Sequence, residues 1–343
     1  MKALLLEEYN KLVIIERPDP EPAPDEVLIR VRAVGICGSD VHGMDGSTGR
    51  RIPPVVMGHE AAGIVIQPGS EVSGIDPNQR VTFDSTIYCG KCACCESGNV
   101  NLCEHRKVFG VSCDEYCQDG ACAEYVTVPA RGIYKIPDKV SFEQAACVEP
   151  LSVALHAVNR AGSVPGGPAV VFGAGMIGIL IVQVLKARGV EQVWAVDVNQ
   201  ERLALAAELG ADKTFDPRET DIAAETRKLT GGGGAALSFD AVGVDETLAA
   251  AVTCLAKQGT CVLVGNFRPV AGLPLQRAVV REITIRGSCA SAGEYPECLE
   301  LLESGKVRVD PLISAVAPLE EGPSWFKRLY DGEPGLFKVI LRP

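Results

Sequence analysis

The sequence lacks an excess of basic residues and an apolar run long enough to cross a membrane. It has 33 lysines and arginines against 44 aspartates and glutamates, which gives a formal net charge of −11. Nucleic acids and anionic membranes are bound through basic faces, so we expect no nucleic-acid partner and no membrane partner. An apolar stretch at 169–185 is interrupted by Gln183 and glycines. It falls short of the roughly 20 apolar residues that a membrane span requires.

The N-terminal segment does not resemble a secretion signal. The short apolar run of MKALLLEEYN meets Glu7 and Glu8, so the segment is too short and too acidic for a signal peptide. We therefore expect a cytoplasmic protein. Its fourteen cysteines are then expected to bind metal or to stay free, because cytoplasmic proteins contain few disulfides.

Two different patterns divide the 343 residues, a length that suggests two domains. Residues 1–150 are rich in turns and short strand-like runs, such as the alternating residues 27–34 and 123–128, and helical spacing first occurs at 142–161. From residue 169 strands and helices alternate, which predicts a doubly wound parallel sheet of the α/β class. The expected strands are 169–172, 193–197, 238–242, 260–264 and 283–286, and the expected helices are 176–188, 200–209, 245–257 and 295–303.

The stretch 169–178 combines a buried strand with a G-x-G-x-x-G turn, AVVFGAGMIG. Gly173 allows a tight turn, Gly175 lets the backbone approach a pyrophosphate, and Gly178 lets helix and strand pack closely. Ile177 lies inside this turn, and the helix N-terminus offers N–H groups to phosphates. The alternative is an ordinary glycine-rich βαβ turn.

Asp197 supports the nucleotide-binding interpretation. It ends the next apolar run, about 20 residues beyond the glycines, where a ribose-binding carboxylate is expected. A carboxylate accepts hydrogen bonds from a free 2′-hydroxyl and repels a 2′-phosphate, and no arginine follows it immediately. The sequence therefore favours NAD over NADP.

A cysteine-rich loop carries the strongest metal-binding motif. The spacing C-x2-C-x2-C-x7-C lets one loop direct several thiolates at one point, and four sulfurs with no open position are typical of structural zinc. The alternatives are a chance cluster of free thiols and an iron–sulfur cluster. Cys94 breaks the spacing and is expected to point away. The expected ligands are Cys89, Cys92, Cys95 and Cys103, and Cys113, Cys117 and Cys122 are interpreted as bystanders, with a second metal or a redox role as the alternative.

A second set of metal-binding residue types is spread along residues 37–149. Cys37, the pair His59-Glu60, and Glu149 each have a simpler explanation, namely a buried thiol, a core histidine and a helix cap. Together they supply a thiolate, an imidazole and carboxylates. A catalytic zinc needs about three such ligands and one open position.

These motifs resemble the zinc-dependent medium-chain dehydrogenases, close to the sorbitol (L-iditol) dehydrogenase branch. The resemblance covers nearly the whole chain and rests on GICGSDVH at 35–42, GHEAAG at 58–63, VEPLSV at 148–153, GAGMIG at 173–178 and REITIRG at 281–287. It implies a GroES-like catalytic domain at 1–152, an inserted Rossmann domain at 153–290, and a return to the catalytic domain at 291–343.

The resemblance also implies roles for individual residues. Cys37, His59 and an acid hold the catalytic zinc, and Glu60 and Glu149 both remain candidates for that acid. Ser39 corresponds to the relay hydroxyl and His42 to the outer histidine of a proton path. Asp40 corresponds to the acid that orients the ligand histidine. Turn capping is the alternative for Ser39 and Asp40, and a plain surface position is the alternative for His42.

On the nucleotide side, Arg202 resembles an adenosine contact, with a solvated helix residue as the alternative. Val264 and Gly265 are expected beneath the nicotinamide. The resemblance thus implies two zinc ions per chain, one catalytic and one structural, and NAD as the hydride acceptor.

The implied activity is oxidation of a secondary alcohol of a polyol or sugar by a homo-oligomer, a tetramer or a dimer. Gly43 replaces an aromatic residue of the sorbitol branch, and residues 288–291 lack its arginine. Sorbitol itself is therefore disfavoured. The alternatives are a sugar phosphate of the galactitol-phosphate type, a butanediol, or threonine. A non-catalytic nucleotide-binding protein is a further alternative, for which we expect only one zinc per chain.

Overall fold

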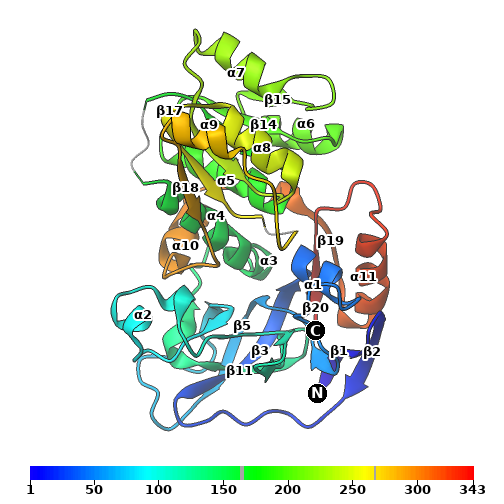
Figure 1. Cartoon of the computed structure of the whole chain (residues 1–343). Helices are drawn as coiled ribbons and strands as arrows, with labels where there is room; N and C mark the ends of the chain where they lie inside the picture. The colour runs from blue at the N-terminus through cyan, green and yellow to red at the C-terminus, as the bar shows by residue number, and fades with distance from the viewer. Residues whose placement is uncertain (163–165, 266–267) are drawn as a thin grey trace. The chain divides into compact units, whose positions relative to one another are not determined.

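The computed structural model describes residues 1–162, 166–265 and 268–343, which form two compact units (Figure 1). Unit 1 comprises Met1–Glu149, Tyr295–Glu303 and Val309–Pro343. Unit 2 comprises Pro150–Glu294 and Ser304–Arg308. Within the described ranges, no helix combines the length and the apolar character that a membrane crossing needs.

Unit 1 is built on a seven-stranded sheet. Its main path runs β12 (Ile133–Lys135), β6 (Arg80–Phe83), β5 (Glu60–Pro68), β3 (Glu26–Gly35), β20 (Lys338–Arg342) and β19 (Ile313–Pro318), and β11 (Tyr125–Pro129) also pairs with β3. A three-stranded sheet joins β2 (Lys11–Glu16), β1 (Lys2–Glu8) and β4 (Val55–Val56), and two-stranded sheets join β7 (Thr86–Ile87) to β8 (Lys107–Val108) and β9 (Val111–Ser112) to β10 (Cys117–Gln118).

The core of unit 1 follows from strand alternation. Val27, Ile29 and Val31 of β3 are buried, whereas Leu28 and Arg30 between them are not. Side chains two apart share one face of a strand, so these residues form a continuous apolar layer. Phe83 of β6 is fully buried and packs edge-to-face on Phe109, with ring centroids 5.3 Å apart. The unit contains the helices α1 (Gly38–Gly43), α2 (Ala93–Glu96), α3 (Phe142–Ala146), α10 (Tyr295–Glu303) and α11 (Gly322–Tyr330).

Unit 2 contains a six-stranded parallel sheet, which confirms the doubly wound prediction. Its spatial order is β15 (Lys213–Phe215), β14 (Val193–Val196), β13 (Ala169–Phe172), β16 (Ala235–Asp240), β17 (Leu255–Leu263) and β18 (Thr284–Gly287). Counted along the chain, this order is 3-2-1-4-5-6, the arrangement of Rossmann dinucleotide-binding folds. Its helices are α5 (Met176–Ala187), α6 (Gln200–Glu208), α7 (Ile222–Leu229), α8 (Asp245–Thr253) and α9 (Leu275–Val280), together with most of α4 (Val148–Ala161).

Both faces of this sheet are covered by helices. Val170 and Phe172 of β13 pack in one cluster with Leu248 and Val252 of α8. Val171 points to the other face, because successive side chains alternate. There it approaches Gly178 of α5. Parallel strands buried on both faces read as continuous apolar runs, which explains why AVVF and VWAV could be predicted from the sequence.

Some element boundaries differ from the prediction. The helical stretch at 142–161 is two helices separated at Cys147, and α3 starts with a capping box between Ser141 and Gln144. Strand β17 begins at Leu255, where the sequence pattern suggested that the preceding helix continued to 257. Strand β15 was not predicted, because three partly exposed residues carry too little periodicity.

We expect Phe83→Ala to destabilise unit 1 by about 3–5 kcal/mol, because it removes a fully buried ring and leaves a cavity. Urea unfolding followed by circular dichroism measures this change. Ile66→Ala on β5 is the control, because Ile66 is 41% exposed, and it is expected to cost less than about 1 kcal/mol. Equal losses in the two variants would contradict the assigned core.

Candidate active site and metal centres

Three neighbouring strands bring distant residues of unit 1 together. Gly35, at the end of β3, pairs with Glu60 at the start of β5 on one side and with Ile340 of β20 on the other. Beyond Gly35 the chain turns into α1, and Cys37 is the residue that precedes this helix. The ends of β3, β5 and β20 therefore meet where Cys37, His59 and Glu60 lie.

The side chains of Cys37, His59 and Glu60 form a group that could hold a metal ion. Their ligand atoms all lie within 4.8 Å of one another. His59 is 5% exposed and Glu60 is 1% exposed. A thiolate, an imidazole and a carboxylate are all established zinc donors. The residues present thus fit a zinc ion, with fewer than four protein donors in the group.

Asp40 lies against the imidazole of His59 and is itself held by Arg51. Asp40 Oδ1 lies 3.3 Å from His59 Nδ1, and it accepts hydrogen bonds from Arg51 Nε (3.0 Å) and Nη2 (2.5 Å). Burial alone would raise the pKa of Asp40, but the charges of His59 and Arg51 outweigh it and hold this pKa well below its usual range. Burial alone would lower the pKa of His59, yet the charges of Asp40 and Cys37 raise it well above its usual value.

The carboxylate of Glu60 is held by a buried lysine. Lys338 Nζ donates to Glu60 Oε1 at 2.9 Å, to Glu60 Oε2 at 2.6 Å and to the carbonyl of Ile36 at 3.0 Å. Burial lowers the pKa of Lys338, but the charges of Glu60 and Cys37 more than compensate and raise it above its usual value. A Cβ atom on Gly35 would collide with the Glu60 side chain. The glycine therefore makes room for this ion pair.

Glu149 lies close to this group but has different partners. The Ser85 hydroxyl donates to Glu149 Oε1 at 2.9 Å. The Ser85 N–H donates to the hydroxyl of Tyr295 at 3.3 Å, and Tyr295 stacks on Tyr134. Burial raises the pKa of Glu149. The group of mutually close ligand atoms contains Glu60 and not Glu149.

The expected relay residues lie on α1. The Ser39 hydroxyl is 3.3 Å from Cys37 Sγ and donates to it. Both Ser39 and His42 are exposed, and the carbonyl of His42 accepts a hydrogen bond from Ser47. Ser39 is thus adjacent to the group of Cys37, His59 and Glu60, and His42 lies one turn further along the same helix.

The four predicted cysteines of the loop lie together. Cys92 Sγ is 3.5 Å from Cys95 Sγ, Cys89 Sγ is 4.0 Å from Cys95 Sγ, and the Cys89 N–H donates to Cys103 Sγ at 3.3 Å. All four ligand atoms lie within 4.8 Å of one another, and Cys94 is outside this group. Such a donor set fits zinc with no open position.

The thiols in this cysteine group affect one another. Backbone N–H groups lower the pKa of Cys92, whereas burial and the Cys92 thiol raise the pKa of Cys95.

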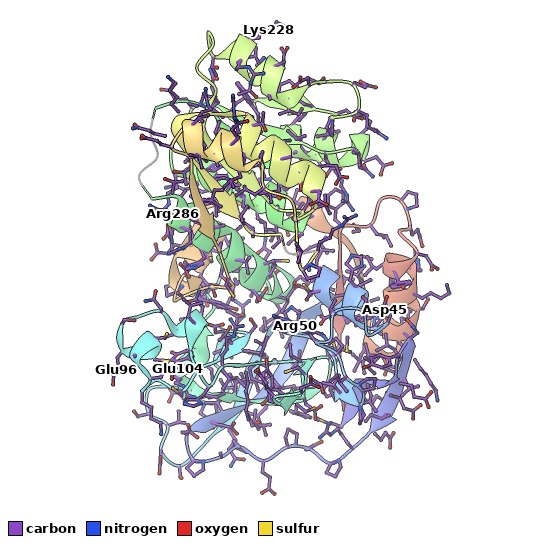
Figure 2. All side chains as sticks on the ribbon, in the orientation of Figure 1. Asp45, Arg50, Glu96, Glu104, Lys228 and Arg286 are labelled. Atoms are coloured by element: carbon purple, nitrogen blue, oxygen red, sulfur yellow. The ribbon has the colours of Figure 1, made fainter. Side chains whose placement is uncertain are left out.

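The acidic residues Glu96 and Glu104 of the same loop are exposed (Figure 2). Among the described residues, neither metal-competent group includes Cys113, Cys117 or Cys122.

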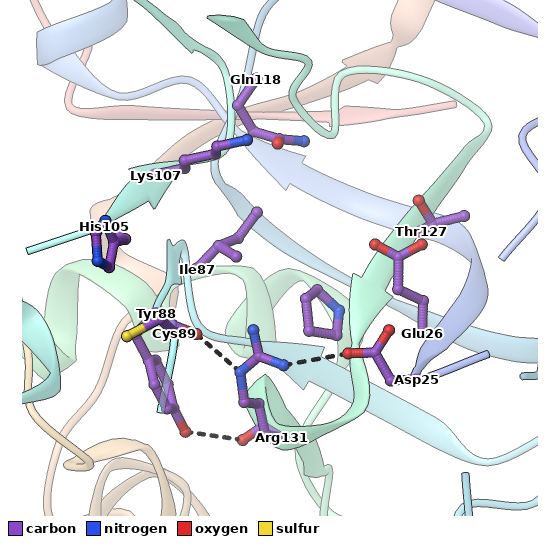
Figure 3. Close-up of a pocket in the computed structure, with 11 residues that line it drawn as sticks. Asp25, Glu26, Ile87, Tyr88, Cys89, His105, Lys107, Gln118, Thr127 and Arg131 are labelled. Carbon is purple, nitrogen blue, oxygen red and sulfur yellow. Dashed lines mark hydrogen bonds and ion pairs between the residues drawn. The ribbon is translucent and has the colours of Figure 1, made fainter. Parts of the chain in front are cut away.

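A pocket of about 310 Å³ lies beside the cysteine group and includes Cys89 (Figure 3). Arg131 is one of its lining residues and donates to the carbonyl of Tyr88 at 2.9 Å and to Asp25 at 3.3 Å. Its lining residues exclude Cys37, His59 and Glu60. The pocket is therefore separate from the group around Cys37.

In unit 2 the glycine turn has the geometry expected for phosphate binding. Gly173 has a φ of +92°, in the left-handed region, and its N–H donates to the carbonyl of Val196 at 2.8 Å. Gly175 directly precedes α5. A Cβ atom on Gly178 would collide with the carbonyl oxygen of Gly173. Only glycine at 178 thus allows α5 to start so close to β13, with its N-terminal N–H groups at the carboxyl end of the strand.

The other predicted nucleotide residues lie at the carboxyl ends of neighbouring strands. Asp197 follows β14, and its carboxylate accepts from the N–H groups of Ala174 (2.7 Å) and Asn199 (2.8 Å). Asn199 caps α6, which carries Arg202. The N–H groups of Val264 and Gly265, after β17, donate to the carbonyl of Asp240. These positions flank the point between β13 and β16 where the strand order reverses, the usual ligand site of such sheets.

Sequence reasoning missed Arg51, Ser85 and Lys338, which contact the predicted acids. None of the three belongs to a spacing motif. Lys338 is 278 positions from Glu60, and Ser85 is 64 positions from Glu149. The sequence indicated only that such acids, once buried, need partners. It does not say which residues supply them.

Comparisons with known proteins agree with this geometry. Residues 23–138 match the alcohol dehydrogenase GroES-like domain, and residues 177–304 match the zinc-binding dehydrogenase domain. The chain is 35% identical over 340 residues to D-xylulose reductase A of Aspergillus niger. The aligned region covers 96% of this chain and 94% of the relative.

Two solved structures are similar over the whole chain. A zinc-binding dehydrogenase from Sinorhizobium meliloti 1021, bound to NADP, has a TM-score of 0.90 and 32% identity and covers 100% of this chain and 99% of its own. A protein from Escherichia coli CFT073, described as a short chain alcohol dehydrogenase and complexed with NADH, has a TM-score of 0.92, 32% identity and the same coverage.

The GroES-like domain, the Rossmann sheet and the grouped zinc donors define a zinc-dependent dehydrogenase with a nicotinamide cofactor. The chain belongs to the zinc-binding alcohol dehydrogenase family, among its medium-chain members. It is an oxidoreductase. The predicted family and the predicted two-part fold are both confirmed.

We expect Gly178→Ala to weaken NADH binding by at least about tenfold, which corresponds to 1.4 kcal/mol. The added Cβ atom would collide with the carbonyl oxygen of Gly173, so the turn must open and the N–H groups at the start of α5 must shift. Fluorescence titration with NADH measures the affinity. Gly166→Ala is the control, because no atom lies within 4 Å of its added Cβ. Unchanged affinity in Gly178→Ala would exclude this turn from the cofactor site.

Proposed function

We propose that this protein uses zinc and NAD to oxidise a secondary alcohol of a polyol or sugar. The observation that carries the proposal is the group of half-buried Cys37 with buried His59 and Glu60, whose ligand atoms lie within 4.8 Å of one another. A structural role alone does not require a thiolate, an imidazole and a carboxylate with a position left open. The similarity to D-xylulose reductase A of A. niger supports a polyol or sugar as the substrate.

Cys37 and His59 are the proposed fixed ligands of the catalytic zinc, and Glu60 and Glu149 are the proposed acids of the site. A carboxylate oxygen of Glu60 lies within 4.8 Å of the ligand atoms of Cys37 and His59, but the carboxylate already accepts two hydrogen bonds from Lys338. Glu149 is held by a neutral hydroxyl. Lys338 thus restrains the Glu60 carboxylate, and Ser85 restrains one oxygen of Glu149.

In the proposed mechanism, zinc supplies a Lewis acid that lowers the pKa of the alcohol, and NAD supplies a hydride acceptor. The residues of the chain perform the other tasks. Asp40 orients His59, as carboxylates commonly orient metal-bound imidazoles. The Ser39 hydroxyl lies at the group and accepts the substrate proton, which passes outward toward His42. Gly173, Gly175, Ile177 and Gly178 hold the pyrophosphate.

NAD is the proposed cofactor, although similar structures contain NADH in one case and NADP in the other. The carboxylate of Asp197 supports NAD, because a 2′-phosphate placed against it would be repelled. Arg202 lies near the glycine turn of residues 173–178. A Cβ atom added to Gly175 would lie 4.0 Å from a guanidinium nitrogen of Arg202. We propose that it contacts the adenosine side, with Val264 and Gly265 beneath the nicotinamide.

We propose a second, structural zinc on Cys89, Cys92, Cys95 and Cys103, and thus two zinc ions per chain. We propose the cytoplasm as the location, a compartment in which cysteines commonly bind metal or stay reduced. We also propose that residues 1–152 and 291–343 form the catalytic domain and residues 153–290 the NAD domain.

A homo-oligomer, a dimer or a tetramer, is also proposed. Residues around α9 form an exposed apolar patch, in which Val270, Leu275, Val279 and Val280 are 64% to 82% exposed. Patches of this kind commonly mark interaction sites. Among the described strands of the same unit, β18 is an edge of the sheet, and edge strands are places where another chain can pair.

We expect Cys37→Ser to reduce the zinc content from two ions to one per chain and to lower kcat/KM by more than about 10²-fold, since loss of even an outer-sphere partner commonly costs about 10- to 100-fold. Atomic absorption counts the zinc, and NADH absorbance follows the reaction. The matched control is Cys117→Ser, because Cys117 is exposed and outside both metal-competent groups.

An active Cys37→Ser variant with two zinc ions would refute the proposed site. A wild-type protein with one zinc, removed by mutation of the four-cysteine group alone, would favour the non-catalytic alternative.

A panel of polyols, sugars, sugar phosphates, 2,3-butanediol and threonine, each with NAD and with NADP, tests the substrate and cofactor. We expect the highest kcat/KM with a polyol or sugar and NAD. A sugar phosphate as the best substrate would shift the assignment to the galactitol-phosphate type. A preference for NADP would contradict the role of Asp197.

A further inference from the structure

Arg51 is a buried charged residue for which neither the motifs nor the proposed mechanism gives a role. It is 3% exposed and lies outside the metal-competent groups. Arginine is rarely buried to this extent unless it is paired. Two of its nitrogens donate to the same oxygen, Asp40 Oδ1, and its Nη1 donates to the carbonyl of Arg50 at 2.9 Å. Arg51 is therefore held in one position.

Asp40 connects Arg51 to the proposed zinc ligand. The same Oδ1 that accepts from Arg51 lies 3.3 Å from His59 Nδ1, and Asp40 is fully buried. With Nδ1 on the Asp40 side, the other ring nitrogen, Nε2, is left to face Cys37 and a metal. Buried Arg51, Asp40 and His59 thus form a continuous row of polar groups that ends at half-buried Cys37.

Gly43 makes room for this arginine. A Cβ atom on Gly43 would lie 2.7 Å from Arg51 Cγ and 3.1 Å from Thr48 Oγ1. The first distance is shorter than real Cβ contacts allow, and Cγ is near the base of the arginine side chain, where little can move. A larger residue at 43 is thus incompatible with Arg51 in its observed place. Arg51 can therefore occupy its place only because position 43 has no aromatic side chain.

We propose that Arg51 is a positioning residue of the metal centre, which fixes Asp40 and through it the ring of His59. A guanidinium offers several donors in a rigid fork, so it restrains a carboxylate more strictly than an ammonium does. Without Arg51, the Asp40 carboxylate can rotate, and the His59 ring loses its fixed orientation toward Cys37. The inference rests on the proposed catalytic zinc at Cys37 and His59.

The test compares the zinc affinity of four variants of the full-length holoenzyme. Arg51→Met removes the guanidinium, Arg51→Lys keeps the charge, and Gly43→Ala displaces Arg51 without changing it. Arg50→Ala is the matched control, since Arg50 is the exposed neighbour in the same segment (Figure 2) and its backbone carbonyl is retained. Zinc retained per chain is measured against increasing chelator, with Cys37→Ser defining the loss of the catalytic ion.

We expect the catalytic zinc to be about 10- to 100-fold weaker in Arg51→Met and Gly43→Ala, the range found when partners of metal-bound histidines are removed. Arg51→Lys should recover part of this loss, and Arg50→Ala should bind as the wild type does. In Co²⁺-substituted protein, the visible difference spectrum against Cys37→Ser should shift in Arg51→Met and Gly43→Ala. A purely structural role of Arg51 would leave this spectrum unchanged.

Wild-type zinc retention and an unchanged cobalt spectrum in Gly43→Ala and folded Arg51→Met would overturn the inference. If Arg51→Met does not fold, Gly43→Ala and Arg51→Lys decide by the same two measurements. If instead Cys37→Ser keeps two zinc ions, the proposed zinc site itself fails. The two failures are thus distinguished by different variants.

Discussion

The candidate site depends on the pairing of charges that are buried around His59. A charge removed from water is stable only with a partner and well-formed hydrogen bonds. Asp40 is paired with Arg51, and Glu60 is paired with Lys338. Each acid thus has its own cation. The group of Cys37, His59 and Glu60, which could hold a metal ion, therefore contains an acid that already has a cation as its partner.

Glycines allow these pairs to form at the ends of the strands. Gly35 leaves space for the Glu60 carboxylate, and Gly43 leaves space for Arg51. In unit 2, Gly178 plays a comparable part by letting α5 begin against the carbonyl of Gly173. In each case the missing side chain allows a backbone or a charged group to approach. The three glycines thus affect both how the elements pack and where the charged groups of the site lie.

Local spacing explains what could be predicted. The four cysteines of the loop lie within 15 positions of sequence, so their chain segment alone brings them near one another, and the glycine turn and the following helix are a single βα unit. The apolar strands of unit 2 were recognisable because they are buried on both faces. The break at Cys147 and the short strand β15 were not, since neither has a periodicity of its own.

By itself, the sequence determined the two-part α/β architecture, the glycine turn with its acid, and the residue types that could bind zinc. It also identified Cys37, His59 and Glu60 as candidates, which the structure brings into one group. Only the tertiary structure decided that Lys338 holds Glu60, that Ser85 holds Glu149 and that Arg51 holds Asp40. The reason is physical: these contacts depend on which strands are neighbours and in what register they pair. The apolar core of the whole unit sets that arrangement, and no short segment contains it.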